Sequence, residues 1–515
     1  MAIYLMGVDI GTTGTKAMIF DLEARVMGTG YRECIAATPE PDWFEFDAEQ
    51  LIERTFEACR EAVDMSGLDP REIKAVSFST QRSTVGFIGE DGKMMRNVMY
   101  SWQDNRATEE VEFQKQCLDE KETTRLSGMP VTPTYCISNI LWFKKHYPEE
   151  YEKAKVVSMV SEFLAKRFGA DDYYCDWGNA SCSGIFDMQK RVWSEKLITA
   201  YGLDAKKFPK VVKSGTVLGR VSGEAAALTG LSTDTLLIAG SGDQSCGALG
   251  AGIVSEGLAE MTIGTAGHLI SYIRQPLASE HVLKMMTVNA AVPGNYELNG
   301  IQLSAASVYR WLRDVVATQE RDTAKGLGMD PYVLMDELVR QSPPGANGLI
   351  LLPYFASAGC PHWDVEAKGV LAGLTFMHTK GDMARAFMEG CMYEMREIME
   401  TMREAGVAFQ ELRITGGATK SALWRQIMAD ILGLPLRRLK ISDATVLGAA
   451  ILAGYGAGVF ASPEEGAAQM VKCDEPILPD QANVAKYNRC YGIFQKLYAA
   501  MKKEHIFALM NGARE

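Results

Sequence analysis

Apolar positions at the beginning of the chain form two short runs that a turn separates. Residues 3–8 and 17–20 are mostly apolar, and glycine and threonine fill the segment 11–15 between them. Two β-rich runs joined by a short Gly/Thr segment are typical of a hairpin rather than of a strand followed by a helix. The pattern therefore predicts two antiparallel strands here.

Helical periodicity first becomes clear after Asp47, which is a suitable N-cap. The apolar residues that follow recur three or four positions apart: Ile52, Phe56, Cys59 and Val63. A longer helical stripe comes much later: Ala384, Met388, Cys391, Met395, Ile398 and Met402. We expect both stripes to pack in a core, although a methionine-rich stripe could also line a pliable binding surface. Strands are expected at 75–79 and 236–239, and the alternation of strands and helices in both halves indicates an α/β fold.

A second Gly/Thr turn, at 261–267, echoes the segment 8–14. This weak internal repeat predicts two similar halves, an N-terminal domain of residues 1–250 and a C-terminal domain of residues 251–515. The length agrees, because 515 residues exceed what one ordinary core can organise.

Composition narrows the class of partner. Hydrophobic residues make up 47% of the chain and charged residues 23%, and the formal net charge is -12. This acidic balance argues against nucleic acid or an anionic membrane as the main partner. The N-terminus lacks the basic region of a signal peptide, and the eleven cysteines show neither a C-x-x-C pair nor zinc-ligand spacing. We therefore expect a cytoplasmic protein with reduced thiols and no metal-binding cysteine cluster.

The first glycine-rich segment, Asp9 to Lys16, places hydroxyls and backbone N–H groups on a tight turn with a cation at its end. Such a turn can wrap around phosphate oxygens, because glycine lets the backbone approach closely. It is not a P-loop, which needs Gly-Lys-Ser/Thr at fixed spacing before a helix. An ordinary hairpin turn would look the same.

Two further segments could carry chemistry. Residues 239–252 follow a strand but lack a complete G-x-G-x-x-G, since Ser245 replaces the third glycine. Asp243 in this segment could act as a general base or could simply cap a helix. Residues 414–421 join a strand to a helix, and their small side chains would let an adenine ring lie against the backbone. A plain strand-to-helix turn would use the same residues.

Taken together and in this order, the segments resemble the FGGY carbohydrate kinases, the family that includes xylulokinase, gluconate kinase and glycerol kinase. Asp9 to Lys16 is similar to the family's first phosphate motif, Gly242 to Gln244 to its catalytic motif, and Thr262 to Thr265 to its second phosphate motif. Gly416 to Ser421 is similar to its adenosine motif. The resemblance implies two actin-like ATPase domains of the ribonuclease H-like kind, with ATP and sugar meeting in the interdomain cleft.

The resemblance also implies a set of site residues. Asp243 would accept the proton of the substrate hydroxyl, and Asp9 and Asp243 would hold hydrated Mg²⁺. The residues implied for ATP are Gly11, Thr12, Thr13 and Lys16 in the first turn, Gly264 and Thr265 in the second, and Gly416, Gly417, Ala418 and Ser421 in the third segment. Those implied for the sugar are Arg82, Ser83, Trp102, Asp104, Asp243 and Gln244. Trp102 could instead be a core residue and Arg106 a surface salt-bridge partner.

Departures from the family pattern bear on the substrate. Ser83 replaces the glutamate, and Thr134 the tyrosine, that are typical of glycerol kinase, while xylulokinases carry Met-His at the positions of Arg82 and Ser83. Arg82 would suit a sugar acid through a bidentate contact, or equally a neutral ketose. We expect ATP-dependent phosphorylation of a pentulose such as xylulose, or of a related polyol or sugar acid. The alternatives are glycerol kinase and a non-catalytic actin-like nucleotide-binding protein. A homodimer is common among similar proteins, but no feature of the chain demands one.

Overall fold

The computed structural model describes residues 2–277, 281 and 283–513, and its contacts divide the chain into two compact units. The first unit consists of Met1–Val254, Tyr272–Glu297 and Asp443–Val471, and the second of Ser255–Ser271, Leu298–Ser442 and Lys472–Glu515. Each unit is assembled from three separate segments of the chain, so the units are not divided at one position. The domain boundary expected at residue 250 remains a prediction.

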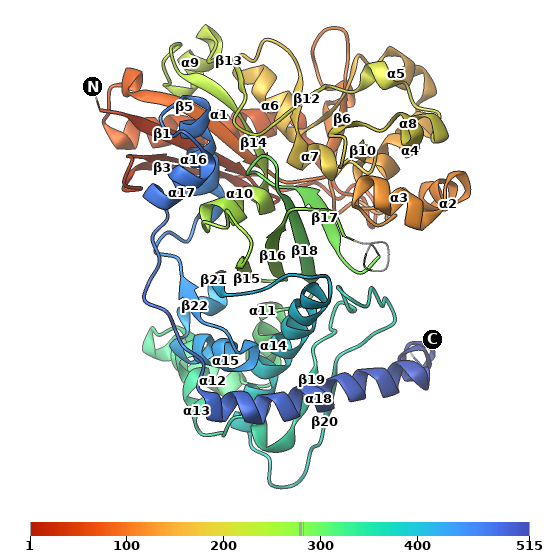
Figure 1. Cartoon of the computed structure of the whole chain (residues 1–515), viewed down its shortest axis with the longest axis vertical. Helices are drawn as coiled ribbons and strands as arrows, with labels where there is room; N and C mark the ends of the chain where they lie inside the picture. The colour runs from red at the N-terminus through yellow and green to blue at the C-terminus, as the bar shows by residue number, and fades with distance from the viewer. Residues whose placement is uncertain (1, 278–280, 282, 514–515) are drawn as a thin grey trace. The chain divides into compact units, whose positions relative to one another are not determined.

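The first unit is built on a six-stranded mixed sheet, which lies in the upper part of Figure 1. Strands β1, β5 and β14 are parallel, and β2, β3 and β13 run antiparallel to their neighbours. The pairing of β1 with β2 confirms the predicted N-terminal hairpin. In spatial order the strands are β13 (Val217–Arg220), β14 (Leu236–Gly242), β5 (Ile73–Thr80), β1 (Tyr4–Ile10), β2 (Gly14–Phe20) and β3 (Val26–Glu33).

One face of this sheet is covered by α1 (Ala48–Ser66), α6 (Val160–Phe168) and α9 (Gly223–Thr229). The predicted stripe of α1 is buried against alternate sheet residues such as Val8 and Phe78. Asp47 caps α1 as predicted, because its side chain accepts a hydrogen bond from the backbone N–H of Gln50. The apolar side chains on one face of the strands and the apolar stripe of α1 therefore pack together in one core.

The opposite face is covered by α16 (Ala444–Gly456), which packs on β1, β5 and β14 and beside α10 (Asp243–Gly250). Backbones approach so closely here that glycine is required at two positions. A Cβ atom on Gly7 would lie 2.0 Å from the carbonyl oxygen of Val446, and one on Gly448 would lie 1.9 Å from that of Cys246. These contacts fix the beginning of α10 against the sheet.

The rest of the first unit surrounds a four-stranded sheet of order β4-β7-β6-β8. Its strands are β4 (Glu45–Asp47), β7 (Val98–Tyr100), β6 (Val85–Ile88) and β8 (Val156–Met159). The short strands elsewhere are β9 (Tyr174–Asp176), β10 (Phe186–Asp187), β11 (Val192–Trp193), β12 (Lys210–Val212) and β17 (Met286–Asn289). The remaining helices are α2 (Thr108–Cys117), α3 (Glu120–Ser127), α4 (Cys136–His146), α5 (Pro148–Lys153), α7 (Trp177–Ser181), α8 (Glu195–Ala200) and α17 (Pro463–Met470).

The second unit has its own mixed sheet, in which β18, β16, β15, β21 and β22 are hydrogen-bonded in that order. Their bounds are β18 (Tyr296–Gln302), β16 (Gly267–Ile273), β15 (Leu258–Ile263), β21 (Glu411–Thr415) and β22 (Leu436–Arg438), and β16 and β18 belong to this unit only in part. A small pair, β19 (Ile350–Leu352) and β20 (Val370–Ala372), stands apart. The antiparallel pairing of β15 with β16 confirms the second predicted turn.

Helices cover the sheet of the second unit. The longest, α14 (Lys380–Glu404), buries the predicted methionine-rich stripe, so that stripe is core rather than binding surface. The others are α11 (Ala306–Val315), α12 (Thr318–Leu327), α13 (Pro331–Arg340), α15 (Ala422–Leu432), α18 (Gln481–Lys503) and α19 (Ile506–Gly512). Each unit therefore has the mixed α/β architecture expected from the sequence.

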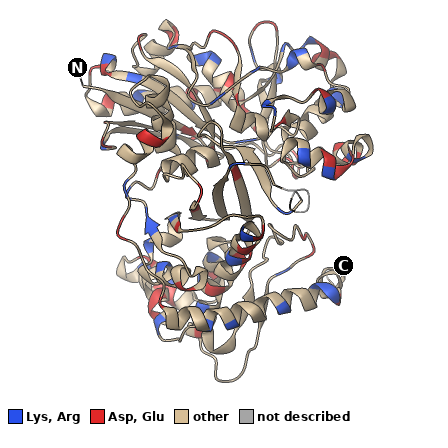
Figure 2. Cartoon of the chain, viewed as in Figure 1, with Lys and Arg blue, Asp and Glu red and all other residues tan. Residues whose placement is uncertain are grey.

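The surface carries charges of both signs. Among the residues that the structure describes, both Lys or Arg and Asp or Glu occur on each unit, scattered over helices and loops (Figure 2). No helix within the described ranges is long and apolar enough to cross a membrane.

Candidate functional site

The first Gly/Thr turn closes β1 onto β2 and places a carboxylate at its base. Asp9 lies opposite Lys16 in the hairpin register, and the backbone N–H of Gly11 donates to the carbonyl of Gly14 at 3.0 Å. The hydroxyl of Ser79, on β5, donates to Asp9 Oδ1 at 2.6 Å. Burial, helped by the nearby negative charge of Asp243, raises the pKa of Asp9 to about 7, although the hydrogen bond from Ser79 opposes the rise.

The carboxylates of Asp9 and Asp243 suit a hydrated divalent cation. Two mutually repelling buried carboxylates gain stability from a bound cation, because its charge favours their ionised forms. Mg²⁺ is usually held by one or two carboxylates and keeps several waters. The described residues contain no cluster of three or more His, Cys, Asp or Glu that would form an all-protein cage. This donor set therefore fits Mg²⁺ bound together with phosphate.

The other predicted residues of the first turn differ in their surroundings. Lys16 forms an ion pair with Asp443, which immediately precedes α16. Thr12 is half-buried, whereas Thr13 is exposed at the tip of the turn. The indole Nε1 of Trp102 donates to Thr12 Oγ1 at 3.0 Å. A residue predicted for the sugar thus contacts one predicted for phosphate, and with 39% of its surface exposed Trp102 is not a core residue.

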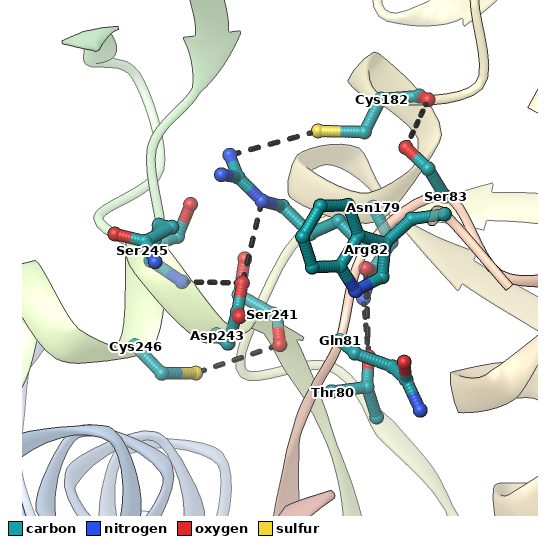
Figure 3. Close-up of polar contacts among 12 residues, drawn as sticks. Thr80, Gln81, Arg82, Ser83, Asn179, Cys182, Ser241, Asp243, Ser245 and Cys246 are labelled. Atoms are coloured by element: carbon teal, nitrogen blue, oxygen red, sulfur yellow. Dashed lines mark hydrogen bonds and ion pairs between the residues drawn. The ribbon is translucent and has the colours of Figure 1, made fainter. Parts of the chain in front are cut away.

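Asp243 is the first residue of α10 and follows β14 directly. Gly242 occupies the N-cap position, and Asp243 Oδ1 accepts a hydrogen bond from the neighbouring backbone N–H of Gln244 at 2.8 Å. The alternative role of Asp243 as a helix cap is therefore wrong. Its carboxylate is instead directed toward Arg82, as Figure 3 shows.

Arg82 approaches Asp243 from the segment after β5. Arg82 Nε lies 3.3 Å from Asp243 Oδ1, and Arg82 Nη1 lies 3.8 Å from the sulfur of Cys182 (Figure 3). Burial raises the pKa of Asp243, and the guanidinium of Arg82 offsets part of that rise. Ser83 adopts a positive φ of 61°, and its hydroxyl donates to the carbonyl of Cys182 at 2.9 Å. These contacts orient Arg82 toward the carboxylate of Asp243.

Several residues around this ion pair were missed by the sequence analysis. Asn179, on α7, donates through Nδ2 to Thr80 Oγ1 at 3.1 Å and to Asp176 Oδ2 at 2.7 Å. Glu297 accepts from the hydroxyl of Ser245 at 2.8 Å and contributes negative charge near Arg82. These residues lie outside the glycine-rich motifs, and it is their burial in the structure, together with their polar side chains, that identifies them.

Asp104 lies in a closed environment. Its side chain is fully buried, and its two oxygens accept a pair of hydrogen bonds from the guanidinium of Arg106, at 2.9 and 2.7 Å. The backbone N–H of Phe44 donates to Asp104 Oδ2 at 2.7 Å. The guanidinium of Arg106 also lies 3.9 Å from the centre of the Trp43 ring. Arg106 is therefore not a surface salt-bridge partner, and the role of Asp104 as a sugar ligand remains a prediction.

The second Gly/Thr turn, in the second unit, is tied to the beginning of α11. The carbonyl of Thr265 accepts hydrogen bonds from the backbone N–H of Ala305 at 3.0 Å and from the hydroxyl of Ser307 at 2.7 Å. Gly416, after β21, has a φ of 90°, and a Cβ atom on it would lie 2.4 Å from the carbonyl of Ile263. Only glycine fits at this close approach, which brings the third segment beside the second turn.

A cavity of about 220 Å³ opens next to the third segment, within the second unit. Gly417, Ala418 and Ser421, which the sequence assigns to adenosine, all line it. Aromatic rings form its walls: Tyr309 stacks on Tyr332 at 5.8 Å and lies 5.0 Å from Trp424, measured between ring centres. Alternating small and aromatic surfaces accommodate a flat ring system.

The chain is similar to known carbohydrate kinases in sequence and in fold. Residues 4–250 match the model of the FGGY family of carbohydrate kinases, N-terminal domain, and residues 259–457 match that of the C-terminal domain. A xylulose kinase of Staphylococcus epidermidis is 27% identical over 97% of each chain. A glycerol kinase of Solidesulfovibrio magneticus is 30% identical over 94% of this chain and 95% of its own. The crystal structure of xylulose kinase from Rhodospirillum rubrum superposes with a TM-score of 0.90, at 27% identity, over 98% of this chain and 100% of its own.

Proposed function

Because the chain belongs to the FGGY family of carbohydrate kinases, we propose that it transfers the γ-phosphoryl group of ATP to a hydroxyl of a small sugar, with Asp243 as the general base. The observation that carries this proposal is the ion pair of Arg82 with Asp243, in which Nε lies 3.3 Å from Oδ1. A carboxylate at the start of a helix, whose Oδ1 meets one guanidinium and one backbone N–H, retains oxygen lone pairs for a substrate hydroxyl.

In the proposed reaction Asp243 accepts a hydrogen bond from the sugar hydroxyl and takes its proton as that oxygen attacks phosphorus. Arg82 offsets part of the rise in the pKa of Asp243 that burial causes, and so favours the ionised form that a base requires. Trp102 offers a partly exposed aromatic face to the C–H groups of the sugar. The contribution of these residues is mainly positioning and charge, since phosphoryl transfer leaves little covalent work for the protein.

The nucleotide is proposed to use the residues assigned from the sequence. Thr12, Thr13, Lys16 and Thr265 contact phosphate oxygens, and the cavity lined by Ser421 takes the adenine base. Asp9 and Asp243 would hold Mg²⁺, which when bound neutralises charge on the phosphates. The ion pair of Lys16 with Asp443 must open, or turn toward the ligand, for Lys16 to meet a phosphate.

A pentulose such as xylulose is the proposed acceptor, with related polyols and sugar acids as the next candidates. The similarity to xylulose kinases supports it, but a glycerol kinase is about equally similar. Two observations disfavour glycerol. Ser83 stands where glycerol kinases have a glutamate, and its hydroxyl already donates to the carbonyl of Cys182.

A coupled assay of ADP release tests the proposal with xylulose, ribulose, gluconate, glycerol and no acceptor. We expect turnover that depends on the acceptor and is fastest with a pentulose. ADP release at the same rate with and without an acceptor would contradict the proposed reaction. Faster turnover with glycerol than with any sugar would contradict the proposed substrate. ADP binding without turnover on any acceptor would favour a non-catalytic nucleotide-binding protein.

A further inference from the structure

One side-chain pair on the wall of the cavity in the second unit has a fixed hydrogen-bond direction. Ser421, the N-cap of α15, lies 2.7 Å through its Oγ from Oδ2 of Asp336, which projects from α13. Both residues line the cavity. Asp336 lies outside every motif that the sequence analysis identified.

The direction follows from the chemistry of the two groups. An ionised carboxylate can only accept hydrogen bonds, so the hydroxyl proton of Ser421 points to Asp336. The oxygen of Ser421 also accepts from the backbone N–H of Trp424 at 3.0 Å, as its capping position requires. One acceptor site therefore remains on Ser421 Oγ, and it has no proton left to offer a ligand.

We propose that Asp336 sets the nucleobase preference of this protein, by keeping Ser421 as a hydrogen-bond acceptor for the exocyclic amino group of adenine. A base with a carbonyl oxygen at that position would place two acceptors against each other and lose the contact. Asp336 is thus a positioning residue, and Ser421 is the residue that touches the base. This inference rests on the assignment of the cavity to ATP in the proposed function.

The cavity walls make such a contact selective. Tyr309, Tyr332 and Trp424 form one wall of the cavity. A base bound against this wall loses contact with water and contacts the protein instead. A site built to hydrogen-bond one donor rejects an analogue that lacks it, because the buried polar atom of the protein is then left unpaired. Discrimination on the order of tenfold or more is expected from one such mismatch.

The proposal is tested by measuring the Kd of ADP and of inosine diphosphate for the full-length protein by isothermal titration calorimetry. Inosine diphosphate carries a carbonyl in place of the amino group, and we expect ADP to bind at least about tenfold more tightly. In Asp336→Asn the new amide can donate to Ser421, which frees the hydroxyl proton to meet a carbonyl, so the ratio of the two affinities should fall toward one. The control Glu337→Gln makes the same chemical change at the next residue of α13, which is exposed and does not line the cavity. It should keep the wild-type ratio.

The ratio separates orientation from stability, because general loosening of α13 would weaken both ligands alike. An unchanged ratio in Asp336→Asn would overturn the proposal. If that variant fails to fold, Ser421→Ala provides the second test, and a wild-type ratio in it would equally overturn the idea. Failure of wild-type protein to bind ADP would overturn both this inference and the proposed nucleotide site. Normal ADP binding with no sugar turnover would refute only the proposed kinase reaction.

Discussion

Arg82 and Asp243 come from two different motifs, 161 positions apart in the chain, and form an ion pair with Nε 3.3 Å from Oδ1. The parallel pairing of β5 with β14 brings their ends together, because both strands point to the same edge of the sheet. Each residue leaves its strand within two positions of the end. The pair is thus a direct product of sheet topology.

Replacing Asp243 with asparagine should abolish most phosphorylation without abolishing nucleotide binding. Asparagine keeps the size of the side chain but cannot accept a proton, and general-base catalysis contributes roughly 10²–10⁴-fold in rate. We expect kcat to fall by that factor and the Kd for ADP to change little. The control is Asp234→Asn, an exposed residue two positions before the beginning of β14. Retained turnover in Asp243→Asn would exclude the base role.

Replacing Arg82 with alanine should raise KM for the sugar by at least tenfold while KM for ATP changes much less. The guanidinium lies beside Asp243, the proposed base, so its loss removes both a hydrogen-bond donor and the charge that orients Asp243. Steady-state kinetics with each substrate varied in turn measure the two constants. Arg96→Ala, an exposed arginine of the same unit, is the control. Equal increases in both constants would remove Arg82 from the sugar site.

The variant Asp104→Asn is expected to lose stability rather than sugar affinity. It breaks a buried ion pair, because Asp104 is fully buried and the side chain of Arg106 is 1% exposed. Breaking such a pair costs roughly 3–5 kcal/mol of unfolding free energy. The loss is smaller to the extent that Glu45, the second partner of Arg106, still compensates the charge of Arg106. Urea denaturation measures the loss, with the exposed Asp64→Asn as control. Unchanged stability with a raised sugar KM would contradict this expectation and support Asp104 as a sugar ligand.

Glu389, buried within α14, should make stability depend on pH. Burial raises its pKa to about 7, although the backbone N–H of Gly345, Arg385 and the hydroxyl of Tyr487 each oppose the rise. The folded protein therefore binds a proton that the unfolded chain releases near pH 4.5, so this stabilisation is complete below that pH and is lost as pH rises through about 7.

Glu389→Gln keeps a neutral acceptor at the same place and should remove this pH dependence. Each pKa unit corresponds to about 1.4 kcal/mol of unfolding free energy. Denaturation of both proteins between pH 5 and pH 8 should show the wild type losing stability relative to the variant as pH rises. Parallel curves for the two proteins across this range would contradict the assignment.

The sequence predicted those parts of the fold and site that local pattern determines. The hairpin around Gly11, the helix capped by Asp47 and the turn at Gly264 were all confirmed, because each depends on residues close together in the chain. The enclosure of Asp104 by Arg106 and Phe44 was not foreseen, because the partner of a carboxylate depends on tertiary packing. Glu297 and Asn179 were missed for the same reason.

The helix Ala444–Gly456, which covers one face of the first sheet, has a consequence for how the protein is made. The ribosome releases the strands β1, β5 and β14 long before it releases this helix, and Gly7 stays without its packing partner Val446 throughout that interval. Most domains can fold in the order in which they are translated. Here the first unit is finished only after most of the second has emerged, so the nascent chain carries an uncovered sheet face through most of its synthesis.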